Sequence, residues 1–220
     1  MTSAVLKYIA VITMFIDHIG AFVLEDMYGI NSTIYILSRS IGRIAFPIFD
    51  FLLVEGFKKT KNRKRYFINL LIFAILSEVP FDLANKGSLM DFNQQNIFFT
   101  LLTNLTMLCV IEKIKIDKID LKSIAEILIV LLFSLVSMLF RFDYSFFAPL
   151  LVYSYYKFYG NKKMRFLASE LSLYFEVFSL VHISNILIYF YNGKRGRQSK
   201  YFFYFFYPLH LLIIYFFTKI

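Results

Sequence analysis

The chain has little of the residue types that build disulfide-linked or metal-clustered proteins. Its 220 residues include one cysteine, Cys109, and four prolines. A lone cysteine excludes an internal disulfide and a cysteine-ligated metal cluster, and we expect no metal site. No internal repeat, low-complexity tract or soluble domain is visible. The first apolar run carries Asp17 and His18 in its interior and lacks an Ala-x-Ala site after it, so we expect no cleavable signal peptide.

Apolar side chains dominate what is there. Hydrophobic residues make up 59% of the chain, with 28 Phe, 16 Tyr and a mean hydropathy of +0.62. This is too much apolar surface for one soluble core, and several apolar runs approach the ~20 residues that cross a bilayer. We therefore predict an all-α fold, a polytopic transmembrane helical bundle surrounded by membrane lipid, with residues 1–220 forming a single integral-membrane domain.

The net charge of +9 is compatible with a nucleic-acid binder, but its distribution favours a membrane protein. The Lys and Arg residues cluster in short gaps between apolar runs, as they do in cytoplasmic loops. We expect no nucleic acid among the partners.

The apolar runs predict about eight spans. Seven are assigned directly: Leu6 to Leu24, Ile41 to Phe57, Tyr66 to Ala84, Asn96 to Ile111, Ile124 to Phe140, Tyr144 to Phe158 and Tyr201 to Thr218. The segment 166–191 is ambiguous, because its length fits either one long tilted helix or two shorter membrane pieces.

Loop charge predicts the orientation in the membrane. The loop 58–65 holds six Lys or Arg residues and no acid, which places it, and by alternation the amino terminus, in the cytoplasm. The predicted location is therefore the inner (cytoplasmic) membrane, crossed several times. The basic turn 192–200 is the exception, since a single span over 166–191 would place it outside. Either that segment crosses twice or re-enters, or the charge serves a ligand; we favour a cytoplasmic turn.

A charged stripe lies in the otherwise apolar stretch from Arg39 to Glu55. If this stretch is one helix, Arg39, Arg43 and Asp50 lie along one face. Charges at bilayer depth cost about 2.5–3.5 kcal/mol each, so the stripe should face a protein interior or a wet cavity. Guanidinium groups there suit a phosphate or carboxylate. The alternative is neutralisation of Arg43 by Asp50 or Glu55, and Pro47 is expected to kink the helix.

His18 is the first candidate for a catalytic base. Imidazole titrates near neutral pH, and His18 lies about three turns into an apolar run with Asp17 beside it. Asp17 is about 100° away around the helix, so it is a neighbour rather than a facing partner. The alternative is a histidine that bonds another helix for structural reasons.

Other polar residues occur inside the expected spans. Glu78 and Asp82 share a helix face, where they could pair with arginines of the charged stripe. Asn96 begins a polar face that suits interhelical hydrogen bonds or, alternatively, a cavity lining. His210 follows Pro208 in the last span.

The basic turn combines glycine with positive charge. Lys194 and Arg195 lie between two glycines, and Arg197 follows. Exposed amides and fixed positive charge suit a phosphate, while an ordinary cytoplasmic loop is the alternative interpretation.

Several separated motifs together resemble the TraX family over nearly the whole chain. They are Ile16-Asp-His-Ile-Gly20, Arg39-Ser-Ile-Gly-Arg-Ile-Ala-Phe-Pro47, Glu55-Gly-Phe57, Ser77-Glu-Val-Pro-Phe-Asp82, Asn96-Ile-Phe-Phe-Thr100, Tyr191-Asn-Gly-Lys-Arg-Gly196 and Phe206-Tyr-Pro-Leu-His210. The family is named for a conjugation protein that acetylates the amino terminus of pilin. The resemblance implies an acetyltransferase that uses acetyl-CoA as co-substrate, with a peptide amino terminus, a sugar or a lipid as acceptor.

On this hypothesis His18 deprotonates the acceptor or forms an acetyl-histidine, and Asp17 orients its imidazole. The acetyl-CoA phosphates are expected to meet Arg39, Arg43, Lys194, Arg195 or Arg197. Further polar residues of the site are Asp50, Glu55, Glu78, Asp82, Asn96 and His210. The predicted topology leaves a tension, because it places Arg39 near the outer end of its span, away from a cytoplasmic co-substrate. The alternatives are a small transporter or flippase with a charged pathway, and a non-catalytic assembly protein.

Overall fold

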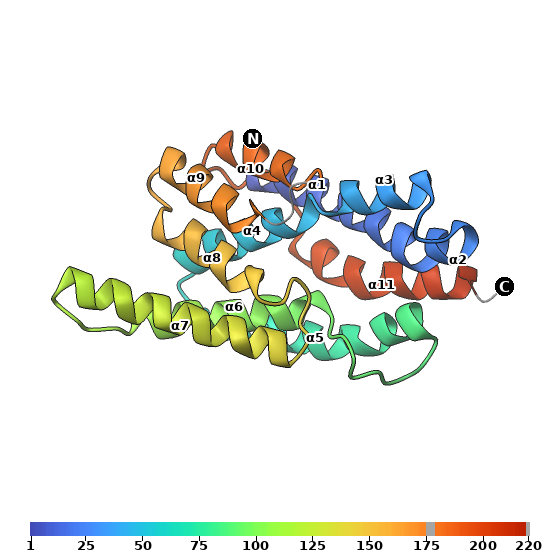
Figure 1. Cartoon of the computed structure of the whole chain (residues 1–220), viewed down its shortest axis with the longest axis horizontal. Helices are drawn as coiled ribbons and strands as arrows, with labels where there is room; N and C mark the ends of the chain where they lie inside the picture. Colours follow the sequence, from blue (N-terminus) through green and yellow to red (C-terminus); the bar gives the residue numbers. More distant parts are fainter. Residues whose placement is uncertain (175–178, 219–220) are drawn as a thin grey trace. The chain divides into compact units, whose positions relative to one another are not determined.

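The structure, a computed structural model, describes residues 1–174 and 179–218, and within these ranges it contains helices and no strand (Figure 1). The prediction of an all-α fold is confirmed. The helices form two compact units. Unit 1 comprises Met1–Leu52, Leu76–Asp91 and the described residues from Leu173 onward, and unit 2 comprises Leu53–Ile75 and Phe92–Ser172. A single domain over 1–220 stays a prediction.

Unit 1 begins with a continuous helical rod from Ser3 to Tyr28. It consists of α1 (Ser3–Ile19), a π-helical segment η1 (Gly20–Leu24) and α2 (Glu25–Tyr28). Thr2 caps α1 by accepting a hydrogen bond from the amide of Val5. The rod ends at Gly29, whose φ of 77° lies in the region that glycine tolerates best. The expected first span is therefore present, and it is longer than predicted.

The stretch from Arg39 to Glu55 is two helices, not the single helix predicted from its charged stripe. Helix α3 (Thr33–Gly42) ends before Arg43, and α4 (Ala45–Lys59) begins three residues later. The ring of a helical proline clashes with the carbonyl four residues earlier, which for Pro47 is that of Arg43. Pro47 thus favours a new helix start at Ala45. The break separates Arg39 from Asp50, so these residues do not share one helix face.

The basic turn lies against the amino terminus of the chain. The amides of Ser3 and Ala4 donate to the carbonyls of Lys194 and Arg195, at 2.9 Å each. The terminal ammonium of Met1 donates to the carbonyl of Phe190, just after α10 (His182–Tyr189). The turn and the amino terminus are therefore on the same side of any membrane, as the preferred interpretation of the loop charge predicted.

Helix α11 (Lys200–Thr218) runs parallel to α1, beside it (Figure 1). Tyr8 contacts Phe203 with ring centroids 5.1 Å apart, and further along both helices the rings of His18 and His210 are 4.9 Å apart. The residue numbers of the contacting pairs increase together along both helices, so the helices are parallel. Pro208 lies within α11, where it removes one backbone donor.

Unit 2 is built from α6 (Ile97–Glu112), α7 (Ile119–Leu139), α8 (Phe147–Lys157) and α9 (Lys162–Ser172), with α6, α7 and α8 in mutual contact. It also contains the beginning of α5 (Arg63–Lys86). Asn96 caps α6, because its side chain accepts from the amide of Phe98 at 3.0 Å and donates to the carbonyl of Ala74 at 2.8 Å. This joins α6 to α5.

Two buried glutamates in unit 2 each bind a lysine and a tyrosine. Glu126 accepts from Tyr153 at 2.9 Å and lies 2.5 Å from Lys157. Glu55 lies 2.5 Å from Lys59 and accepts from the hydroxyl of Tyr159. Burial and the hydrogen bond to Glu55 raise the pKa of Tyr159, so this hydroxyl stays a neutral donor at physiological pH. The charges are thereby compensated inside the unit.

Four helical segments are long and apolar enough to cross a membrane by length and composition: Ser3–Tyr28, Arg63–Lys86, Ile119–Leu139 and Tyr201–Thr218. Only 22–28% of the most apolar window of each is buried in the protein, and large apolar side chains such as Ile75, 61% exposed, and Leu132, 56% exposed, cover the outside. Such surfaces are unfavourable in water and suit lipid. The chain is a membrane protein.

The predicted number of about eight spans is not confirmed. Ile97–Glu112 is apolar but shorter than a full span. The ambiguous segment 166–191 contains the end of α9 at Ser172 and then α10, which agrees with two shorter pieces rather than one long helix. Residues 175–178 of this segment lie outside the described residues.

Candidate active site

Helices α1 and α3 approach closely because glycine occupies two contact positions. A Cβ added at Gly42 would lie 2.1 Å from Asp17 Oδ1, and one added at Gly20 would lie 2.3 Å from Ser38 Oγ. Real Cβ atoms keep contacts of at least 3.0 Å. Small residues of this kind allow membrane helices to bring polar groups together at backbone distance. Gly42 and Gly20 thus set the position of Asp17 against α3.

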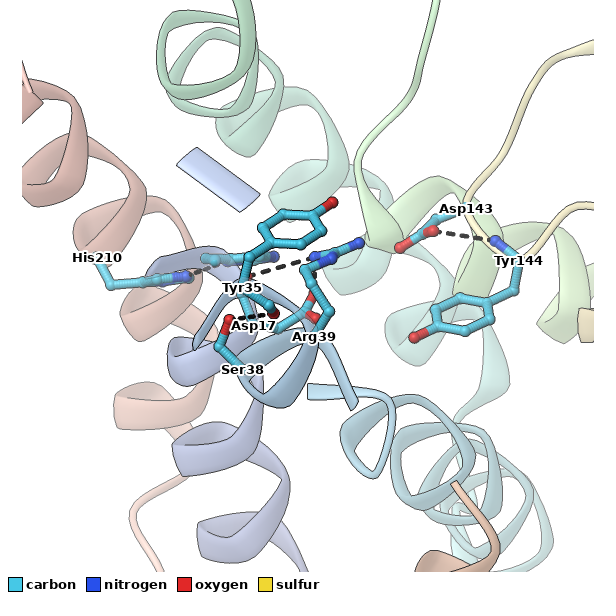
Figure 2. A network of polar contacts seen from close by, with 8 residues as sticks. Asp17, Tyr35, Ser38, Arg39, Asp143, Tyr144 and His210 are labelled. Carbon is cyan, nitrogen blue, oxygen red and sulfur yellow. Dashed lines mark hydrogen bonds and ion pairs between the residues drawn. The ribbon is translucent and has the colours of Figure 1, made fainter. Parts of the chain in front are cut away.

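An ion pair between Asp17 and Arg39 joins these helices (Figure 2). Arg39 Nη1 lies 2.7 Å from Asp17 Oδ2 and also donates to the backbone carbonyl of Asp17, at 3.3 Å. The side chains are 16% and 27% exposed for Asp17 and Arg39, so the pair is partly shielded from the surroundings. Within the described ranges Arg39 bonds through Nη1, which leaves Nε and Nη2 available for a ligand.

His18 meets His210 of α11. His18 Nδ1 lies 2.6 Å from His210 Nε2, and His210 Nδ1 lies 2.7 Å from the carbonyl oxygen of Phe206. The ring planes are 2° from parallel and the centroids 4.9 Å apart. Because the two nitrogens are so much closer than the centroids, the rings lie edge to edge and not one above the other. The result is a chain of hydrogen bonds from His18 through His210 to the backbone.

Aromatic rings surround the histidine pair. Phe206 stacks on His210 at 4.8 Å, and Tyr207 presents its edge to both imidazoles, at 5.8 Å from His18 and 5.5 Å from His210. Phe22 packs on His18 at 5.3 Å. His210 is 3% exposed. Packing of this density restricts both rings to few rotamers.

The π-helical segment η1 starts two residues after His18. The amide of Glu25 bonds the carbonyl of Gly20, which is the wider i to i+5 pattern. Isolated π-helical turns are frequent at functional sites, because they change the direction of neighbouring side chains. Here the wide turn begins at Gly20, one of the two positions where α3 approaches closely.

Asp17 and His18 lie in the interior of the first candidate span, and Arg39 of α3 pairs with Asp17 from beside it. From Ser3 to His18 the helix rises about 22 Å, at 1.5 Å per residue. Arg39 is therefore level with the middle of the rod, whereas the predicted topology placed it near the outer end of its own span; the orientation itself stays a prediction. The basic turn, in contrast, lies at the beginning of α1, and its Lys194, Arg195 and Arg197 are exposed.

The expected partners of these residues differ from the observed ones. Asp17 was expected to orient His18, yet its carboxylate bonds Arg39, and His210 takes the position beside His18. Arg39 was also considered as a partner of Glu78 or Asp82. Asp82 instead accepts from the amide of Asp91, at 2.8 Å.

The remaining predicted site residues take no part in the contacts described above for the His18–His210 pair or the Asp17–Arg39 ion pair. Arg43 is half-buried at the carboxyl end of α3, Asp50 is fully buried in α4, and Glu78 is half-buried in α5. Glu55 and Asn96 belong to unit 2, where they take part in the Tyr159 and helix-cap contacts described above.

Three features were missed in the sequence. The pairing of His18 with His210 joins residues 192 positions apart, and spacing within a single helix contains no information about it. Gly20 and Gly42 could have been recognised as a small-residue contact, because each lies within two residues of a charged or titratable side chain in an apolar run. Glu126 could have been found as the lone acid in the fifth apolar run.

Comparison with known proteins agrees with the sequence motifs. The profile of a family described as TraX protein matches residues 2–218. A relative from Dichelobacter nodosus, named probable fimbrial assembly protein FimC of serogroup H1, is 28% identical across 95% of this chain and 92% of its own length. No solved structure matches the chain.

Proposed function

Because the chain belongs to the TraX family, we propose that it is a multi-pass acetyltransferase of the cytoplasmic membrane. It would transfer the acetyl group of acetyl-CoA to an amine or hydroxyl acceptor. The family resemblance supplies the reaction, and one observation supports the site. Inside the first candidate span, His18 is hydrogen-bonded to a second imidazole, and the adjacent Asp17 pairs with Arg39 of α3. Ionisable groups at this depth are costly, and functional sites are where they are usually retained.

The reaction needs a base and a group that stabilises negative charge. The acceptor attacks the thioester carbonyl carbon while the imidazole of His18 removes the acceptor's proton. The carbon–sulfur bond then breaks, and the proton passes from His18 to the departing CoA thiolate. Arg39, fixed by Asp17 through Nη1, offers Nε and Nη2 to the oxyanion of the tetrahedral intermediate. In this proposal Arg39 acts at the reacting carbonyl rather than on the phosphates.

The phosphates of acetyl-CoA are assigned to the basic turn. Its side chains are exposed on the side of the amino terminus, which the loop charges predict to be cytoplasmic, where acetyl-CoA is available. The pantetheine arm would then extend along α1, over the rise of about 22 Å to His18. The acceptor and the co-substrate could thus meet inside the membrane without any acetyl group crossing it.

A variant of the basic turn tests this assignment. Replacing Lys194, Arg195 and Arg197 together by Gln should raise the KM for acetyl-CoA about tenfold with little change in kcat, because exposed ion pairs contribute only about 0.2–1 kcal/mol each. The matched control replaces the exposed Lys113, Lys115 and Lys118 of unit 2 by Gln. An equal effect of the two triple variants would remove the basic turn as the phosphate site.

A second candidate is a role in fimbrial assembly without catalysis, and the name of the Dichelobacter nodosus relative favours it. The two candidates are compatible if the acceptor is the amino terminus of a fimbrial subunit. They differ in whether acetyl-CoA is consumed, so this is what the experiment must measure.

The experiment uses the purified protein in detergent with labelled acetyl-CoA and three kinds of acceptor: a pilin-type peptide, an amino sugar and an aminolipid. We expect wild-type turnover, a loss of about 10²–10⁴-fold in His18→Ala, and near-normal turnover in His182→Ala. His182 is the matched control because it is a half-buried histidine on a different helix of unit 1. Unchanged turnover in His18→Ala would remove His18 as the base, and the absence of acetyl consumption with every acceptor would leave assembly or transport as the function.

A further inference from the structure

The hydrogen bonds around His210 determine which nitrogen of His18 carries a proton. A carbonyl oxygen can only accept, so His210 Nδ1, 2.7 Å from the carbonyl of Phe206, must be the donor. A neutral imidazole has one donor and one acceptor nitrogen, which makes His210 Nε2 the acceptor. His18 Nδ1, 2.6 Å away, must then donate to it. His18 is left with a bare lone pair on Nε2.

From this geometry we propose that His210 is a positioning residue, which holds His18 in the Nδ1-protonated tautomer so that Nε2 acts as the base. The inference deepens the proposed acetyl transfer and rests on it for its catalytic meaning. A base must present an unprotonated nitrogen to the acceptor, and the group bonded to its other nitrogen decides which one that is. His210 performs the task for which a carboxylate is the usual choice.

Among the described residues, the hydrogen bonds of the histidine pair include none to an acid. Asp17, the carboxylate adjacent in the chain, points about 100° away from His18 and bonds Arg39 Nη1 of α3. Aromatic rings pack against the two imidazoles, and three of them, Phe22, Phe206 and Tyr207, hold the edge-to-edge arrangement in place.

The arrangement also gives the transferred proton a place to rest. When His18 Nε2 takes the proton of the acceptor, His18 becomes an imidazolium whose Nδ1–H still donates to His210 Nε2. If that second proton shifts to His210, His210 donates from both nitrogens, to the Phe206 carbonyl and to His18. The positive charge is then shared by two rings until the thiolate leaves and is protonated through His18 Nε2. Every proton that enters the pair thus leaves it again.

The test reads the tautomer directly by two-bond ¹⁵N–¹H correlation in protein labelled with ¹⁵N-histidine, purified in detergent without any substrate. The chain has three histidines, so each resonance is assigned by substituting one at a time. We expect His18 to be protonated on Nδ1 in the wild type. In His210→Leu, which suits the apolar surroundings, this preference should be lost. A wild-type His18 protonated on Nε2 overturns the proposal.

A pair of amide variants separates hydrogen bonding from structure. In His210→Gln the side-chain oxygen reaches the place of Nε2 and can accept from His18 Nδ1, whereas in His210→Asn the amide reaches only the place of Nδ1. We expect the Nδ1-protonated tautomer of His18 to persist in the Gln variant and to be lost in the Asn variant. If both amides act alike, the proposal fails, because a role in packing alone would not distinguish them.

Turnover provides the catalytic readout. His210→Leu and His210→Asn should lower kcat about a hundredfold and leave the KM for acetyl-CoA unchanged, and His210→Gln should restore most of the loss. If the protein shows no turnover but the tautomer of His18 still changes with the substitution at residue 210, the acetyltransferase proposal is overturned and the hydrogen-bond chain is supported. A tautomer insensitive to residue 210 overturns the chain, whatever the turnover.

Discussion

Replacement of Gly42 by alanine should disturb the candidate site. Among the glycines that have no positive φ, we expect Gly42 to be the position where alanine has the largest effect. The added Cβ would lie 2.1 Å from Asp17 Oδ1, 2.2 Å from its Cβ and 2.4 Å from its Cγ. The Cβ of Asp17 is fixed to the backbone of α1, so rotation of the carboxylate alone cannot relieve the clash. Helices α1 and α3 must separate by about an ångström to restore ordinary contact, which is how overpacking propagates in dense cores.

The magnitude follows from the two consequences of this separation. Overpacking of a close contact costs about 1–3 kcal/mol in the free energy of unfolding. For a chain of this size each kcal/mol lowers the melting temperature by about 2–4 °C. The ion pair of Asp17 and Arg39 spans the two helices, so its geometry changes by the same distance. Misplacement of a reacting group by about 1 Å can lower turnover a hundredfold.

The assay is thermal unfolding in detergent, followed by helicity, together with acetyl transfer at one temperature well below melting. Gly160→Ala is the matched control, because a Cβ at Gly160 meets nothing within 4 Å. The double variant Asp17→Gly, Gly42→Ala removes the atoms in conflict, so the alanine should have little effect on stability in that background. If Gly42→Ala and Gly160→Ala have the same melting temperature, the close approach of α1 and α3 is refuted, independently of any enzymatic activity.

Two further predictions concern stability. Gly193 and Gly196 both have positive φ, so alanine at either position should lower the free energy of unfolding by about 1–2 kcal/mol. Gly196→Ala should cost more than this, because the new Cβ would also lie 2.6 Å from Thr2 Oγ1, whereas a Cβ at Gly193 meets nothing within 4 Å. Equal melting of the two variants would contradict the docking of the basic turn on α1. Asn96→Ala should cost about 2–4 kcal/mol, because it removes the cap of α6 and leaves the carbonyl of Ala74 without its donor. Loss of turnover in Asn96→Ala beyond the loss of folded protein would instead indicate a role in the site.

The sequence was sufficient for the fold class, and it supplied candidate site residues whose positions the structure then gives. Apolar composition predicts a helical membrane protein, and the positive charges predict that the basic turn and the amino terminus share a side, as their hydrogen bonds show. His18 and Arg39, each chosen separately as a functional candidate, lie in the same structural unit, and their roles stay predictions. Such residues can be recognised without their partners, because a charged group in an apolar run is costly wherever it lies.

Partners could not be predicted, because helical periodicity describes one helix at a time. The stripe of Arg39 and Asp50 assumed an unbroken helix, and the steric effect of Pro47 on the carbonyl of Arg43 ended that helix first. The pairing of His18 with His210 depends on the parallel packing of α1 and α11, which no local pattern encodes. The span count depends on helix length in the same way, since α3 and α4 divide a stretch that composition alone would join.

Adjacent positions on a helix point about 100° apart, and this alone forces Asp17 and His18 to find partners on different neighbours. The acid faces α3 and receives an arginine, so the charge of each is compensated where it is buried. The imidazole faces α11 and receives another imidazole, which needs no counter-ion. A carboxylate in the place of His210 would orient His18 equally well, but it would bury a further charge at the middle of a membrane span, at a cost of several kcal/mol unless it were compensated. A second histidine orients the first without that cost, and this is a physical reason for the base of an intramembrane site to be held by a neutral ring.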